Sequence, residues 1–151
     1  MRTKLLFPII FFILIICSTP NSGHESKKTN SVFPVLKGPY LGQEPPGMEP
    51  EIFGPGIISS AEHEHSYPAF TSDGKEVFWT VMFTSLKIEF PPMILTMTCE
   101  NNLWSKVKIA EFSGVFPDGE GCVSPDGKKF FFGSQRPIGG KIEPKKDLDI
   151  W

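Results

Sequence analysis

The pattern of apolar and polar positions repeats once along the chain. In each copy a short apolar stretch leads to a polar turn, and a second apolar stretch rich in aromatic residues follows; the copies are Tyr67–Thr80 and Glu120–Gly133. They align without a gap, and the aspartates of the two turns are 126 − 73 = 53 residues apart. An Asp-Gly pair between apolar stretches is a strong hairpin signal, because glycine adopts positive φ and aspartate bonds to its own backbone. The pattern therefore predicts two strand–turn–strand units, with turn residues Asp73, Gly74, Asp126 and Gly127.

Apolar residues fall on both faces of the strand expected over 75–83, where Val77 and Trp79 alternate with Phe78. Such a strand is typical of a sheet that packs against neighbours on both sides. The sequence predicts an antiparallel meander around this strand and a shorter meander after it. The expected strands are 67–71, 75–83, 93–99 and 103–110, then 119–124, 128–134 and a third strand over 147–151 whose partner is missing; the expected loops are 84–92 and 135–146.

The chain begins with a basic and then apolar segment. Arg2 and Lys4 precede the apolar stretch 5–16, which is typical of the core of an export signal and short for a membrane-spanning helix. Residues 1–17 are expected to be a signal peptide or a lipoprotein signal, with Cys17 as the residue for lipidation, although Ile16 is bulky for a cleavage site. Lipidation, secretion and an uncleaved anchor stay open, and each exports the protein. A buried N-terminal helix of a cytosolic protein leaves the basic start unexplained.

Two segments of different composition follow this start. Residues 18–32 are polar and are predicted to form a flexible tether. Residues 33–60 contain so many Pro and Gly that no helix is expected, and we predict an extended leader that crosses one face of the sheets. Its expected apolar anchors are Tyr40, Leu41, Ile52, Phe53, Ile57 and Ile58.

The repeated unit resembles the WD40-like repeat of TolB-type β-propellers. The resemblance depends on Asp73-Gly74-Lys75 and Asp126-Gly127-Lys128 followed by aromatic residues, on Ser134-Gln135-Arg136-Pro137, and on Asn102-Leu103-Trp104-Ser105-Lys106. It covers roughly residues 40 to 151 and implies architecture more than function. The implied fold is all-β: a partial β-propeller of about one and a half to two four-stranded blades, with blade 1 over 61–113 and an incomplete blade 2 over 114–151.

A partial propeller raises the question of how its apolar surface is covered. Propellers close with about four to eight blades, and stacked repeats generally need at least three units. We therefore expect a fragment of a longer propeller, or a chain that self-associates through its open blade edge. The residues expected at this exposed apolar edge are Phe130, Phe131, Phe132 and Trp151.

Charge and cysteine content narrow the classes of partner. The net charge of −2 with 21% charged residues argues against a nucleic-acid partner. The only expected contact with a membrane is through the N-terminal signal or lipid anchor. In an exported protein Cys99 and Cys122 have two interpretations that stay open: a disulfide, or two small buried apolar side chains.

Candidate chemistry is sparse. His63 and His65 lie two residues apart and would share a face of a strand, but a metal site needs further ligands, so a polar segment is the main interpretation. Asp73 and Asp126 are explained by their turns. The chain has no Gly-x-Ser-x-Gly, no phosphate-binding Gly-rich loop and no Cys-x-x-Cys. We predict no catalytic residue, cofactor or metal.

The resemblance implies a non-catalytic interaction module of the cell envelope that binds a protein, peptide or glycan. The expected location is the periplasm, or the outer membrane or cell surface for a lipoprotein. Propellers present loops and a central channel to their ligands, and the residues that would line this channel are His63, His65, Tyr67, Asp118 and Glu120. The alternative is the propeller part of an envelope hydrolase, a peptidase or glycosidase, whose catalytic part lies elsewhere.

Overall fold

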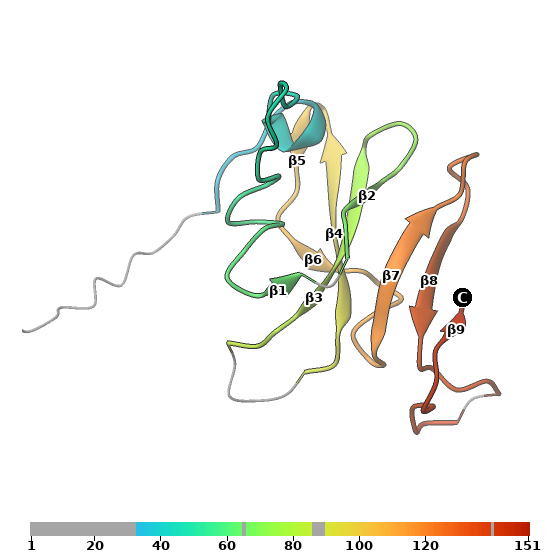
Figure 1. The fold of residues 1–151 in the computed structure, drawn as a ribbon. Helices are drawn as coiled ribbons and strands as arrows, with labels where there is room; N and C mark the ends of the chain where they lie inside the picture. The colour runs from blue at the N-terminus through green and yellow to red at the C-terminus, as the bar shows by residue number, and fades with distance from the viewer. Residues whose placement is uncertain (1–32, 65, 86–89, 140) are drawn as a thin grey trace, which may run out of the picture. The chain divides into compact units, whose positions relative to one another are not determined.

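The computed structural model describes residues 33–64, 66–85, 90–139 and 141–151 (Figure 1). The expected signal segment with Cys17, the tether 18–32 and the candidate residue His65 lie outside the described residues. The described part is almost all β, as predicted, with strands in two sheets and one short 3-10 helix. None of its helices has the length and apolar character needed to cross a membrane.

The first sheet is curled and contains six strands within the described residues: β1 (His63–Glu64), β2 (Ala69–Phe70), β3 (Glu76–Met82), β4 (Met93–Glu100), β5 (Leu103–Trp104) and β6 (Lys108–Ile109). β3 pairs with β1 and β2 on one side and with β4 on the other. The single strand predicted over 103–110 is divided into β5 and β6, and both pair with β4. Between them the hydroxyl of Ser105, rather than its carbonyl, accepts the N–H of Thr98 at 3.1 Å, which interrupts the regular ladder.

The second sheet consists of β7 (Asp118–Val123), β8 (Phe130–Ser134) and β9 (Asp149–Ile150), in that order. β9 pairs antiparallel with β8, and Phe132 and Trp151 exchange two backbone hydrogen bonds of 3.1 and 2.9 Å. The last predicted strand therefore does have a partner, which is β8.

Equivalent residues of the two copies pair in the same register. Ala69 lies opposite Phe78 in the first sheet, and Cys122 lies opposite Phe131 in the second sheet. Both residues of the second pair come 53 positions after their counterparts in the first pair (122 − 69 = 53 and 131 − 78 = 53). The register in the second sheet then shifts between Gly119 and Cys122, and the exposed Glu120 in this bulge has a φ of 55°. The sequence repeat is thus also a repeat of strand pairing.

The two Asp-Gly turns have the same internal hydrogen bonds. Gly74 and Gly127 have φ of 67° and 70°, a conformation that glycine adopts without strain. Asp73 Oδ1 accepts the hydroxyl of Thr71 at 2.7 Å and the N–H of Lys75 at 3.1 Å. Asp126 makes the equivalent bonds with Ser124 and Lys128. These hydrogen bonds lower the pKa of both exposed carboxyl groups from the usual 3.8, because they stabilise the charged form. The bond from the hydroxyl group has the largest effect, and the bond from the backbone N–H comes next.

The leader crosses one face of the first sheet and contains η1 (Pro39–Gly42). Leu41 and Ile58 are buried among Trp79 and other residues of β3 and β4, and Phe53 and Ile57 pack against this cluster. Tyr40 and Ile52, which were also expected to be anchors, are exposed. The leader thus covers the face of β3 that carries Val77, Trp79 and Val81, and it leaves a few of its own side chains at the surface.

The opposite face of β3 packs against the second sheet. Phe78 and Phe130 have ring centroids 4.4 Å apart, and Phe132 is buried in the same cluster. The expectation that Phe130 and Phe132 are exposed is therefore wrong, because β8 turns both rings toward the first sheet. Phe131, on the other face of β8, and Trp151 are each 39% exposed. Cys99 and Cys122 carry free thiols, so the disulfide that stayed open is not formed, and Cys122 is exposed rather than buried.

Candidate functional site

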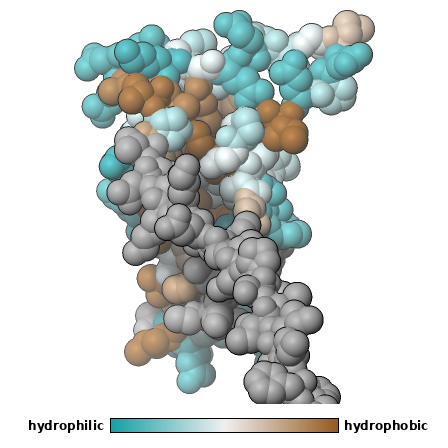
Figure 2. All heavy atoms as spheres, turned by 90° about the vertical axis from the view of Figure 1, so that its left-hand side faces the viewer, coloured by the Kyte–Doolittle hydropathy of each residue, from teal (hydrophilic) through white to brown (hydrophobic). Residues whose placement is uncertain are grey.

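A groove with a volume of about 500 Å3 lies where the leader crosses β2, and we call it the aromatic groove. Its lining residues are Tyr40, Gln43, Glu44, Pro45, Pro46, Glu51, Phe53, Pro68 and Phe70. Figure 2 shows hydrophobic side chains bordered by hydrophilic ones at the top of the view, the same end at which η1 lies in Figure 1. A concave apolar site with a few polar groups is the usual form of a ligand-binding site.

Three aromatic rings form the floor and walls of the groove. Phe70 on β2 lies at the centre, and the centroids of Tyr40 and Phe53 are 5.4 and 5.9 Å from it, at interplanar angles of 74° and 71°. Phe70 also contacts the buried Trp104 edge to face at 6.2 Å. Edge-to-face pairs contribute about 0.5–1.5 kcal/mol each beyond the burial of area. The rings are therefore held in place by the core behind them.

The backbone that presents Tyr40 is strained. Tyr40 and Leu41 have φ of 50° and 62°, a region that costs a side chain of this size on the order of 1–3 kcal/mol. Burial of Leu41 and a 2.8 Å hydrogen bond from Trp104 Nε1 to the carbonyl of Gly38 hold this segment. Strain that the surrounding structure maintains is found preferentially at functional sites.

Gln43 joins the two segments of the leader that form the groove. Its Nε2 donates to the carbonyl of Ile52 at 3.0 Å, and its Oε1 accepts the N–H of Gly54 at 2.9 Å. The side chain therefore fixes the 40–46 wall at a constant distance from the 51–53 wall. The groove exists before any ligand arrives, which reduces the entropic cost of binding.

The charged groups of the groove are both acidic. Glu44 and Glu51 are exposed, and neither carboxylate has a hydrogen bond or ion pair with another described residue. Lysine, arginine, serine, cysteine and histidine are absent from the described lining. The groove can therefore attract positive charge.

His63, Tyr67, Asp118 and Glu120, the described residues among those predicted to line a channel, are not part of the groove lining, and two of the segments that carry them meet at Thr80 of β3. The Thr80 N–H donates to Ser66 Oγ at 3.0 Å, and Thr80 Oγ1 accepts the N–H of Glu120 at 3.2 Å. Thr80 thereby joins the segment that leads to Tyr67 with the bulge of β7. Tyr67, 72% exposed, and His63 in β1 are at the surface.

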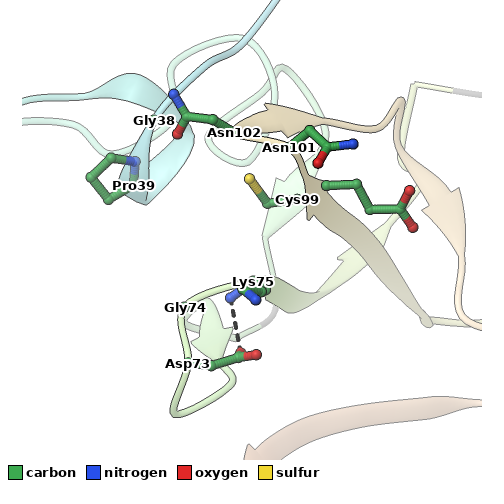
Figure 3. A pocket seen from close by; sticks show the side chains of 9 residues that line it. Gly38, Pro39, Asp73, Gly74, Lys75, Cys99, Asn101 and Asn102 are labelled. Atoms are coloured by element: carbon green, nitrogen blue, oxygen red, sulfur yellow. Dashed lines mark hydrogen bonds between the residues drawn. The ribbon is translucent and has the colours of Figure 1, made fainter.

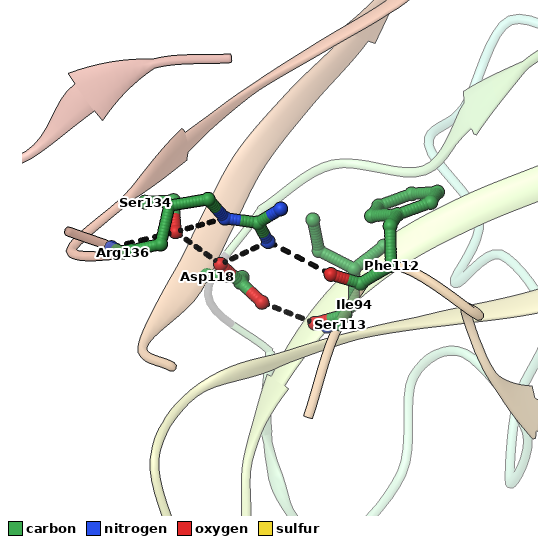
Figure 4. Close-up of polar contacts among 6 residues, drawn as sticks. All are labelled: Ile94, Phe112, Ser113, Asp118, Ser134 and Arg136. Carbon is green, nitrogen blue, oxygen red and sulfur yellow. Dashed lines mark hydrogen bonds and ion pairs between the residues drawn. The ribbon is translucent and has the colours of Figure 1, made fainter. Parts of the chain in front are cut away.

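Asp118, another of these residues, is only 1% exposed (Figure 4). Its Oδ2 accepts the hydroxyl of Ser113, and its Oδ1 accepts the Ser134 hydroxyl at 2.5 Å and Arg136 Nη2 at 3.0 Å. Arg136 Nη2 also donates to the carbonyl of Phe112 at 2.7 Å. Because its acceptors are used internally, we assign Asp118 to holding the turn after β6 against the second sheet, not to contact with a ligand.

A second, polar pocket of about 580 Å3 lies beside the first Asp-Gly turn (Figure 3). The thiol of Cys99 points into it between Asn102 and the turn, and the dashed line marks the bond between Asp73 and Lys75. Within the described residues no three His, Cys, Asp or Glu side chains gather in a way that would hold a metal ion. We therefore take the aromatic groove as the candidate functional site.

Comparisons with protein families, with curated proteins and with solved structures found no match to this chain.

The aromatic groove was not predicted from the sequence, which indicated Tyr40 and Phe53 only as anchors of the leader. A signal does exist in the composition of the leader: aromatic residues, the Pro45-Pro46 pair and three glutamates lie within the short segment 40–53. Their convergence on Phe70 depends on the left-handed backbone at Tyr40, which no local pattern predicts.

Proposed function

We propose that this chain is a non-catalytic interaction module of the cell envelope that binds an extended peptide in the aromatic groove. The observation that carries the proposal is the preformed groove, with three aromatic rings and two adjacent prolines on a strained and cross-linked backbone. Grooves lined by aromatic residues are a recurring means of binding proline-rich, extended peptides. The location in the envelope is supported by the basic and then apolar start of the chain.

We further propose that the two sheets are successive blades of propeller type. Two observations support this proposal: the two sheets share a pairing register, and equivalent residues of β3 and β8 point in the same direction across the two sheets. Phe78 of the first sheet faces the second sheet and is 8% exposed, and its equivalent Phe131 faces away from the first sheet. A regular stack of layers has this arrangement, in which each sheet turns the same face toward the next.

The binding proposal predicts a specific effect of Tyr40. The full chain is used to select peptides from a random library, and the selected peptides are measured by fluorescence polarisation. Tyr40→Ala is expected to weaken binding about tenfold, a loss of about 1.4 kcal/mol, because it removes an exposed aromatic wall of the groove. Tyr40 is 52% exposed, so the substitution affects the groove more than the core.

Tyr67→Ala is the matched comparison, since Tyr67 is an exposed tyrosine outside the groove lining. It is expected to leave the affinity unchanged. Loss of binding with Tyr67→Ala but not with Tyr40→Ala would contradict the proposal and move the site to the residues around Thr80. A library that yields no peptide whose binding depends on Tyr40 would contradict the ligand class.

The outer face of the second sheet supports a proposal of self-association. Phe131, Cys122 and Ile150 are exposed on neighbouring strands of this sheet, and the equivalent Phe78 is covered. We propose that a second copy of the chain covers this face, and we expect Phe131→Glu to shift a concentration-dependent dimer to monomer in light scattering. Ile142→Glu, at an exposed loop residue, is the control. A wild-type chain that stays monomeric at all concentrations would refute this proposal.

A further inference from the structure

The charges of the aromatic groove identify the kind of peptide it accepts. We infer that the groove binds a peptide through an arginine side chain, whose guanidinium lies against the aromatic rings and between Glu44 and Glu51. This inference rests on the proposed function and specifies its ligand.

The first support is electrostatic. Both charged residues of the lining are glutamates without a partner among the described residues, and the lining that the structure describes contains no lysine or arginine. A cationic ligand would supply the missing partner for both carboxylates. Two like charges beside an apolar surface also attract a cation at longer range and disfavour acidic peptides.

The second support is the aromatic surface. The ring of Tyr40 contacts Phe70 edge to face and is half exposed, so part of it stays open to the groove. A guanidinium within about 6 Å of a ring centroid is attracted by the ring quadrupole. Arginine suits this site better than lysine, because its planar guanidinium stacks on aromatic rings and can also donate two parallel hydrogen bonds to one carboxylate.

The third support is that the same protein already holds an arginine in this way. The guanidinium carbon of Arg136 lies 4.7 Å from the ring centroid of Phe132 and 5.4 Å from that of Trp151, and Nη2 lies 3.0 Å from Asp118. In this fold a guanidinium is thus already held between aromatic rings and a carboxylate, with further hydrogen bonds to the Ser134 hydroxyl and the Phe112 carbonyl. The aromatic groove provides three rings and two carboxylates with no internal cation.

The test uses the full chain and a fluorescein-labelled proline-rich peptide with one central arginine. Its partner peptide carries citrulline at that position, which keeps the shape of arginine but has no charge. We expect the arginine peptide to bind about tenfold more tightly than the citrulline peptide, an advantage that decreases with added salt. The double variant Glu44→Gln/Glu51→Gln is expected to remove this advantage. Glu49→Gln, at an exposed glutamate of the same leader outside the groove lining, is the control and should preserve it.

The outcomes separate this inference from the proposed function. If both peptides bind equally well and Tyr40→Ala weakens both, the groove binds peptides and the arginine inference is wrong. If arginine binds more tightly but the advantage survives in the double glutamine variant, the assignment to Glu44 and Glu51 is overturned. If neither peptide binds and the library yields no peptide that depends on Tyr40, the proposed function fails and the inference fails with it.

Discussion

Replacing Asp118 with alanine is expected to lower the free energy of unfolding by about 3 kcal/mol. The carboxylate is buried and accepts hydrogen bonds from Ser113, Ser134 and Arg136. Its removal leaves the hydroxyl of the fully buried Ser134 without its acceptor, and it leaves the guanidinium of Arg136, which is largely removed from solvent, without its carboxylate partner. A charge left without its partner costs more than the lost hydrogen bonds alone. Urea denaturation of the wild type and the variant, followed by tryptophan fluorescence, measures the difference.

Asp126→Ala is the matched control, because Asp126 is an exposed aspartate whose bonds are confined to its own turn. It is expected to cost about 1 kcal/mol or less. If Asp118→Ala costs no more than Asp126→Ala, the buried network does not hold the two sheets together. The double variant Asp118→Ala/Arg136→Met gives a second criterion: removal of both charges should recover part of the lost stability.

Asp118 also shows why sequence patterns identify some residues and not their roles. Asp118-Gly119 has the same residue types as the Asp-Gly pairs of the two turns, yet it lies in a strand and is buried. The difference comes from its partners: the pairing of β7 with β8 places Ser134 and Arg136 beside Asp118, and Ser113 reaches it from the turn after β6. The resemblance-based expectation of a channel residue had no information on these partners.

Features that depend on neighbouring residues in the chain were predicted well. The strand β3, the two Asp-Gly turns and the offset of the two units follow from alternation and turn chemistry. The exposure of Phe130 and Phe132 was predicted wrongly, because the sequence shows that β8 is apolar but not which of its faces meets β3. The sequence lacks the information that decides the exposure of these two rings, which is how the second sheet packs on the first.

The leader has two roles that its composition did not distinguish. First, it covers the face of β3 that carries Val77, Trp79 and Val81. The equivalent face of β8, which carries Phe130 and Phe132, packs against the first sheet. In the proposed stack of blades, the leader would thus take the place of a preceding blade. The same crossing brings Tyr40 and Phe53 to Phe70, so the burial of the first sheet and the formation of the groove depend on one chain path.

Gly42 is the residue on which this path depends most directly, and Gly42→Ala is expected to affect both stability and binding. Its φ is +82°, and a Cβ at this position would lie 2.4 Å from the carbonyl oxygen of Lys37. Alanine therefore meets an unfavourable backbone conformation and a clash with another part of the backbone, which no side-chain rotation relieves. We expect a loss of about 2–3 kcal/mol in the free energy of unfolding. Because Gly42 is the last residue of η1, two positions after Tyr40, the shift of the backbone also displaces Tyr40, and peptide affinity should fall about tenfold.

Gly47→Ala in the same leader separates this effect from a general effect of alanine. A Cβ at Gly47 meets no atom within 4 Å, so both stability and affinity are expected to stay at the wild-type values. Denaturation and fluorescence polarisation on the three proteins give the comparison. Wild-type affinity in a destabilised Gly42→Ala would show that the strained path through Tyr40 serves the core alone. Equal effects of the two substitutions would show that the leader tolerates alanine independently of its φ and would remove the link between backbone strain and the groove.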